Sequence, residues 1–145
     1  MTVVIVDTNV WVSAVINPHG FPAQLVNAWL AGRFEVAISL PILAEIAEVL
    51  MRPRIKNKYK LSGADIDKFL SLLQQRARHV EIHGAIRLCR DPDDDLILET
   101  AISGHAQFLV SRDDDLKTDA DLIAQMQVSG ITVISVQQFL LWLEN

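Results

Sequence analysis

Acidic side chains occur at four places in the sequence from which a fold could bring them together. Asp7 directly follows the apolar run Val3–Val6, and Glu45 lies within a helical pattern. Asp94 lies among other aspartates, and Asp113 follows a later apolar run. Carboxylates that meet at one point repel each other unless a cation compensates their charge. All-oxygen ligands without a Cys/His cluster favour Mg²⁺ or Mn²⁺, and such a centre suits phosphodiester hydrolysis.

The position of Asp7 allows two interpretations. A carboxylate at the end of a buried strand costs desolvation free energy unless a cation or hydrogen-bond donors compensate it. Asp is also a favoured N-cap residue, and a helix is expected to begin near Val10. For Asp7 alone, a metal ligand and a helix cap remain equally open.

Helical geometry separates Glu45 from Glu48. On a wheel of about 100° per residue, Glu45 lies at the rim of an apolar face that includes Ile42 and Val49. Glu48 lies about 60° further toward solvent. A carboxylate beside a packed face needs a partner, which a metal ion would supply. A salt-bridged residue at the rim is the alternative, and for Glu45 taken alone it is the favoured one.

The acidic segment that begins at Asp91 reads as the start of a helix. Pro92 suits the first helical position, which makes Asp91 the N-cap. Asp94 then shares a face with apolar residues at i+3, i+4 and i+7 and points inward. The helix dipole favours acids in the first turn by ~0.3–1 kcal/mol, but it does not explain an inward position. The other acids are predicted to point toward water: Asp93, Asp95 and Glu99.

A second acidic segment follows the apolar run Phe108–Val110. Asp113 is the nearest of three consecutive aspartates to the end of this run. Ser111 can supply a hydroxyl that orients a carboxylate or a water. The alternative is a solvated loop with one helix cap, and we expect this for Asp114.

The elements that must position these residues alternate along the chain. Apolar, β-branched runs predict strands at Val3–Val6, Glu35–Ile38, Phe108–Val110 and Thr132–Ile134, and more weakly at His79–Ile82. Helical periodicity covers Pro22–Ala31, Pro41–Met51, Ser62–Ala77, Pro92–Gly104 and Val136–Leu143. This alternation predicts an α/β fold with a parallel sheet covered on both faces. Ligands of such sheets bind beyond the carboxyl ends of the strands.

Composition sets broad limits. The 145 residues suit one domain over the whole chain, 1–145. The single cysteine, Cys89, excludes an internal disulfide and favours a reducing compartment, so we expect a cytoplasmic protein. No stretch approaches the roughly 20 apolar residues that span a bilayer, so no membrane partner is expected.

The net charge of −5 conceals an uneven distribution. Ten of the eighteen acidic residues lie between Asp91 and Asp121. Five of the thirteen basic residues fall within nine positions: Arg52, Arg54, Lys56, Lys58 and Lys60. An acidic centre beside a basic flank suits an enzyme that binds a cation and a polyanion together. On the charges alone, two solvated charge runs remain the favoured interpretation.

The four acidic motifs resemble, in order, those of the PIN domain family. Asp7-Thr-Asn-Val resembles the opening motif, and Glu45 matches the helical glutamate. Asp91-Pro-Asp-Asp94 resembles the central motif, and Ser111-Arg-Asp113 is similar to the Ser/Thr-Gly-Asp segment, with Arg112 in place of the common glycine. Within the family, the Asp-Pro-x-Asp spelling most resembles toxin components of prokaryotic toxin–antitoxin modules.

This resemblance implies a three-layer α/β/α sandwich with about five parallel strands that cuts single-stranded RNA with Mg²⁺ or Mn²⁺. It also implies a homodimer and inhibition by a cognate antitoxin protein. The catalytic quartet carries over to Asp7, Glu45, Asp94 and Asp113. Supporting roles fall to Asn9, Ser111, Asp91 and Asp115.

Our hypothesis for the reaction is that Asp7, Asp94 and Asp113 hold the metal, directly or through water. Glu45 completes the coordination or orients the attacking water. The basic segment Arg52–Lys60, which includes Tyr59 for stacking, is the candidate for holding the RNA backbone.

Two other functions are open. Phosphoryl-transfer domains on similar sheets also carry an Asp after the first strand. However, haloacid-dehalogenase-like phosphatases have a second Asp where this chain has Asn9, and receiver domains have a late lysine, whereas no lysine follows Lys117. A PIN-like module that binds RNA without cutting it is the other alternative, which the presence of all four acids disfavours.

Overall fold

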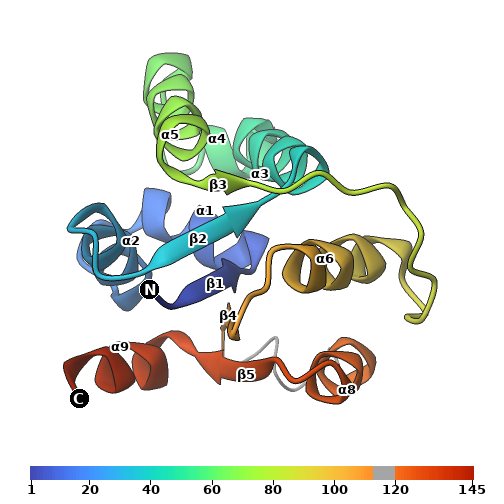
Figure 1. Ribbon diagram of the computed structural model, residues 1–145. Helices are drawn as coiled ribbons and strands as arrows, with labels where there is room; N and C mark the ends of the chain where they lie inside the picture. Colours follow the sequence, from blue (N-terminus) through green and yellow to red (C-terminus); the bar gives the residue numbers. More distant parts are fainter. Residues whose placement is uncertain (113–119) are drawn as a thin grey trace.

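The computed structural model describes residues 1–112 and 120–145, and a parallel sheet forms their centre (Figure 1). Its strands are β1 (Val3–Val6), β2 (Glu35–Ile38), β3 (Arg78–His79), β4 (Phe108–Ser111) and β5 (Thr132–Ser135). They lie in the order β3-β2-β1-β4-β5, and each neighbouring pair is parallel. Helices cover the sheet, so the predicted α/β/α sandwich with a five-stranded sheet is confirmed.

The central strand β1 is apolar along its whole length because both faces of the sheet are covered. All four residues of β1 are buried, as are the last three residues of β2. The predicted bounds of these two strands are correct, and β4 and β5 each extend one residue further, to Ser111 and Ser135. The predicted strand His79–Ile82 is wrong in extent, since β3 is only Arg78–His79.

The helices form layers on the two sides of the sheet. They are α1 (Thr8–Ile16), α2 (Phe21–Leu30), α3 (Leu40–Met51), α4 (Pro53–Lys56), α5 (Gly63–Arg76), α6 (Pro92–Ser103), α8 (Ala120–Val128) and α9 (Val136–Glu144). Contacts join α2 to α9 on one side of the sheet and α6 to α8 on the other (Figure 1). Among the residues described, no helix has the length and apolar character needed to cross a bilayer.

The five predicted helices match observed ones to within one residue at each end. The first helix begins at Thr8 rather than near Val10, and α4 and α8 were not predicted. Aromatic packing fixes α1, because buried Trp11 packs edge-on against Trp29 of α2, with ring centroids 5.4 Å apart. Trp11 also contacts Phe69 of α5 at 6.1 Å. The helix that follows Asp7 is therefore held from two sides.

Candidate active site

The carboxyl ends of β1 and β4 form the centre of the candidate site. The chain adds β2 and β3 on one side of β1 and adds β4 and β5 on the other, so the order of the strands reverses between β1 and β4. Ligands of open parallel sheets bind at such a switch point. Asp7 and Ser111 lie there, and the Ser111 hydroxyl donates a hydrogen bond of 3.1 Å to Asp7 Oδ2.

This contact bears on the two interpretations of Asp7. Asp7 does occupy the N-cap position of α1, and its carbonyl accepts the N–H groups of Val10 and Trp11 at 3.0 and 3.3 Å. Its side chain makes no capping hydrogen bond to the first turn of α1. The half-buried carboxylate accepts the Ser111 hydrogen bond, so the side chain of Asp7 does not cap the first turn.

Helix α3 brings Glu45 beside the start of α1. Thr8 Oγ1 donates a hydrogen bond of 3.1 Å to Glu45 Oε2, and Thr8 is only 5% exposed. Glu45 is half-buried and Glu48 is exposed, so the predicted difference between them is confirmed. Thr8 is a site residue that was not predicted from the sequence. Its position directly after Asp7 was the available signal.

An open cleft of about 480 Å³ lies beside Glu45, between α3 and α6. Asp93 of α6 lines this cleft together with Glu45 and Glu48. Arg52 lies at the same cleft and forms an ion pair with Glu48, with 3.0 Å between Nη2 and Oε1. The cleft therefore combines acidic groups with one arginine from the basic segment.

The start of α6 agrees in part with the prediction. Asp91 is the N-cap, and its side chain accepts the Asp93 N–H at 2.9 Å. Asp94 is half-buried in the first turn, whereas Asp93 is exposed. Asp94 therefore lies closer to the packed side of the helix than Asp93 does.

The prediction that Asp95 and Glu99 point toward water is wrong, because both are buried. Asp95 Oδ1 accepts the N–H groups of Leu88 and Cys89 at 3.0 and 2.7 Å. Glu99 accepts those of His83 and Ala85. The loop that follows β3 crosses this polar face of α6, and its backbone N–H groups replace water.

These hydrogen bonds change the acidity of the groups that take part. The bond from the Cys89 backbone N–H holds the pKa of Asp95 below its ordinary value, and the bond from His83 does the same for the pKa of Glu99. Burial, with Asp95 beside it, raises the pKa of the Cys89 thiol to about 12. Both carboxylates are thus stabilised in the charged form, while the thiol stays protonated at neutral pH.

The residues present suit a hard cation by their chemistry. Asp113 and Asp115 lie outside the described residues. Within residues 1–112 and 120–145, no three His, Cys, Asp or Glu side chains form a group that could hold a metal ion. Asp7, Glu45 and Asp94 therefore do not make such a group by themselves. Carboxylate oxygens are the ligands that Mg²⁺ and Mn²⁺ prefer. The next acidic residue in the sequence after Ser111 is Asp113.

Asn9 and the basic segment are the remaining predicted residues. Asn9 is exposed in the first turn of α1. The basic segment forms α4 and the turn that follows it, where four of the five basic side chains are exposed and Lys56 is half-buried. Tyr59 is 39% exposed, and Lys58 Nζ lies 5.3 Å from the centre of its ring.

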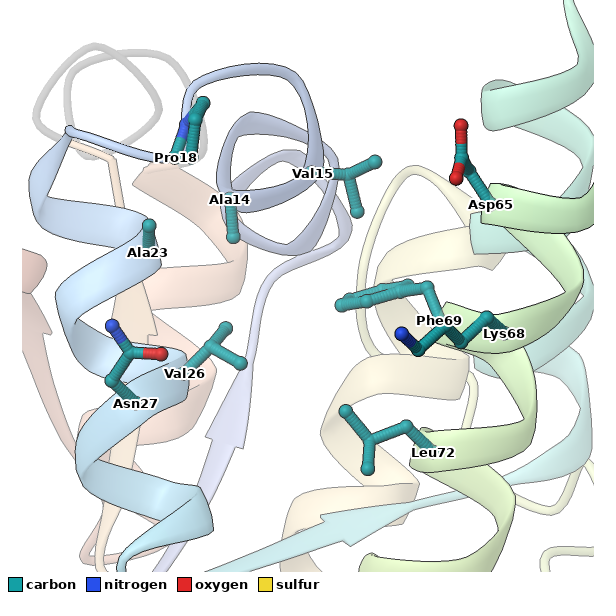
Figure 2. Close-up of a pocket in the computed structure, with 10 residues that line it drawn as sticks. All are labelled: Ala14, Val15, Pro18, Ala23, Val26, Asn27, Asp65, Lys68, Phe69 and Leu72. Carbon is teal, nitrogen blue, oxygen red and sulfur yellow. The ribbon is translucent and has the colours of Figure 1, made fainter. Parts of the chain in front are cut away.

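A separate apolar groove of about 420 Å³ lies between α5 and the α1–α2 pair (Figure 2). Figure 2 shows Phe69 and Leu72 of α5 facing Val15 of α1 and Val26 of α2. Of the predicted catalytic acids that the structure describes, namely Asp7, Glu45 and Asp94, none lines this groove. The groove and the acidic cleft are therefore distinct surfaces.

Comparison with known proteins assigns this arrangement to a family. The sequence profile of the PIN domain matches residues 3–115, which include all four acidic motifs and strands β1 to β4. The chain belongs to the PIN domain family. PIN domains are generally nucleases, and they typically use divalent metals. The PIN domain described here is also 27% identical over 128 residues to an uncharacterized protein of Methanocaldococcus jannaschii, covering 88% of this chain and 81% of that protein.

Proposed function

We propose that this PIN domain is a metal-dependent endoribonuclease that cuts single-stranded RNA. The observation that carries the proposal is the hydrogen bond between Ser111 and Asp7 at the switch point of the sheet. Beside it, Thr8 holds Glu45 on the neighbouring helix. Two acids from distant parts of the sequence are thus oriented by hydroxyl groups at one edge, where a parallel sheet places its ligands.

In the proposed reaction, Asp7, Asp94 and Asp113 would hold Mg²⁺ or Mn²⁺. Such a cation would supply a lowered pKa for the attacking water and stabilisation of charge on the leaving oxygen. Ser111 keeps the carboxylate of Asp7 in one orientation, and Glu45, fixed by Thr8, orients the water. Asn9, Asp91 and Asp115 are the other residues that we propose support the four catalytic acids.

The basic segment supports the choice of RNA as substrate. Arg52 lies at the acidic cleft, and the exposed cations of α4 and its turn continue from it. Neutralising Arg54, Lys58 and Lys60 together should reduce the slope of log affinity against log salt by about 2 for a single strand. An unchanged slope in an anisotropy titration would exclude this segment from the binding surface.

The biological setting that we propose is a cytoplasmic toxin–antitoxin pair. The Asp-Pro-x-Asp spelling at Asp91–Asp94 supports the toxin role, which includes a cognate antitoxin protein and a homodimer. Light scattering on the purified chain tests the dimer. Growth of cells that express the chain, compared with cells that express an Asp94→Asn variant, tests the toxin role.

Cleavage of a mixed single-stranded RNA pool tests the nuclease itself. We expect cutting with Mg²⁺ or Mn²⁺, none with EDTA, and none by the Asp94→Asn variant. Asp67→Asn on α5 is the matched control, since it makes the same chemical change at an exposed acid outside the site. Cutting that persists in Asp94→Asn would contradict the assigned site. Intact RNA with a folded protein that binds it would favour a binding module that does not cut.

A further inference from the structure

A further pocket, of about 470 Å³, lies at the far end of α1 from Asp7. Its lining residues come from α1 and its end, from the start of α2 and from the turn after α4: Ser13, Ile16, Asn17, Pro22 and Tyr59. A volume of this size is typical of a site for a small ligand. The pocket shares no lining residue with the acidic cleft, and Tyr59, which the sequence offers for stacking, is one of its walls.

The backbone holds Tyr59 firmly beside this pocket. The N–H of Leu61 bonds to the carbonyl of Lys56 at 2.9 Å, and the N–H of Lys60 bonds to that of Asn57 at 3.3 Å. Lys60 has a φ of 53°, in the left-handed region. This is the Schellman pattern of a helix end, in which glycine is the usual residue at the left-handed position. A lysine there carries a conformational cost, and the resulting turn keeps Tyr59 at the surface.

The groups around the pocket have complementary chemistry. Tyr59 supplies an aromatic ring, and Ser13 supplies a hydroxyl. The Asn17 side-chain oxygen accepts the His19 N–H at 3.1 Å. This bond occupies the oxygen, and the Nδ2 group remains as the hydrogen-bond donor of the amide. Lys58 Nζ lies over one face of the ring, 5.3 Å from its centre, and adds a positive charge there. Proteins bind an unpaired nucleobase with a stacking ring and polar contacts to the base edge, and they bind its phosphate with a nearby cation.

We propose that this pocket binds one unpaired base of the RNA, with the base stacked on Tyr59. The proposal rests on the ribonuclease function proposed above and adds a site that sets where the strand is held. Helix α1 runs from Thr8, next to Asp7, to Ile16, a distance of about 12 Å along its axis. An RNA strand that runs along α1 would thus reach the acidic edge of the sheet within a few nucleotides of the bound base.

Binding measured without cleavage tests the proposal. Fluorescence anisotropy in EDTA compares a short labelled single-stranded RNA with an abasic ribose-phosphate oligomer of the same length. Tyr59→Ala should weaken RNA binding about tenfold through lost stacking, whereas Tyr59→Phe should bind as the wild type does. Lys58→Ala is the contrasting variant, because it should reduce the salt slope by about 0.7, whereas Tyr59→Ala should leave the slope unchanged.

The abasic oligomer makes the test specific for a base. Wild-type protein should bind it about tenfold more weakly than RNA, and Tyr59→Ala should bind both equally, because the two losses are the same contact. Equal RNA binding by wild type and Tyr59→Ala would overturn the base pocket and leave the nuclease proposal intact. No RNA binding by the wild type at any salt concentration would also overturn the base pocket, and the cleavage assay with Mg²⁺ or Mn²⁺ decides the nuclease proposal separately. Circular dichroism checks that each variant is folded.

Discussion

Two hydroxyl groups, those of Thr8 and Ser111, hold the acids that a metal site would need. Thr8 bonds to Glu45 and Ser111 to Asp7, each at 3.1 Å, and both hydroxyl residues are buried. Neither would contact the metal in the proposed mechanism. Residues that hydrogen-bond to metal-ligating side chains fix the orientation of those side chains. Their loss typically reduces metal affinity or activity 10- to 100-fold.

We therefore predict that Thr8→Val lowers the rate of RNA cleavage about 10- to 100-fold. Valine keeps the shape of threonine but cannot donate to Glu45. Thr8→Ser retains the hydroxyl and should restore most of the activity. Cleavage rates at several Mn²⁺ concentrations, together with urea unfolding of both variants, provide the measurement. Equal rates for Thr8→Val and wild type would show that Glu45 needs no support from Thr8.

Individual side chains show where sequence reasoning succeeds and where it does not. The helical wheel separated Glu45 from Glu48 because α3 packs on only one face. The same reasoning failed for Asp95 and Glu99, because a wheel contains no information about a distant loop. Only the folded chain shows that the backbone of residues 83–89 covers them.

Glu99 also carries a prediction about pH. Bonds from the His83 and Ala85 N–H groups lower its pKa below the value in the unfolded chain. The stability from this lowered pKa is therefore complete above the unfolded value and is lost as the pH falls through the folded value. Glu99→Gln should cost about 1.5 kcal/mol at pH 7, and the difference from wild type should shrink in acid.

Urea unfolding at several pH values measures this difference. Glu81→Gln is the control, since Glu81 is an exposed glutamate near the same loop. A cost for Glu99→Gln that is the same at pH 7 and in strong acid would contradict a role for the charged carboxylate.

At the scale of elements, four of the described helices end in the Schellman hydrogen-bond pattern. These helices are α2, α6, α8 and α4, and the pattern of α4 includes the turn that follows it. Glycine occupies the left-handed position after α2 and α8, at Gly32 and Gly130. Lys60 and His105 occupy it after α4 and α6, with φ of 53° and 55°. A left-handed non-glycine residue costs roughly 1–2 kcal/mol, so two of these ends retain a strained residue.

Lys60→Gly should therefore stabilise the protein by about 1 kcal/mol and weaken RNA binding by removing a charge. His105→Gly should give a similar stabilisation without the loss in binding. Lys58→Gly removes a charge at a position without a positive φ, so it should weaken binding and gain no stability. Urea midpoints and RNA anisotropy measure the two effects. If Lys60→Gly were less stable than the wild type, the left-handed conformation of Lys60 would not be a source of strain.

The elements themselves were largely predictable from sequence. Strands β1 and β2 and five helices follow directly from apolar runs and helical periodicity. Strand β3 is shorter than predicted. The Val80 N–H still bonds to the Ile38 carbonyl of β2, but the chain then leaves the sheet, and the N–H groups of His83 and Ala85 bond to Glu99 of α6. Helix α4 is four residues long, too short for a periodic pattern to reveal.

At the scale of the whole molecule, the strand order creates the site. Placing β4 beside β1 brings Ser111 to Asp7, residues that lie 104 positions apart in the chain. Apolar runs predict strands but not their order, so sequence alone could place these residues only at the same edge of the sheet. The strand order shows in addition that Asp7 and Ser111 are neighbours. They lie next to the start of α1, where Thr8 contacts Glu45 at the cleft between α3 and α6.

Titration of the protein with Mn²⁺ by calorimetry tests the central claim most directly, because it needs no knowledge of the RNA target. The wild type should bind Mn²⁺, and Asp7→Asn and Asp94→Asn should each weaken binding at least tenfold. Asp67→Asn, an exposed acid on α5, should leave it unchanged. Equal Mn²⁺ affinity in all four proteins, or no binding by the wild type, would contradict a metal site at this edge of the sheet.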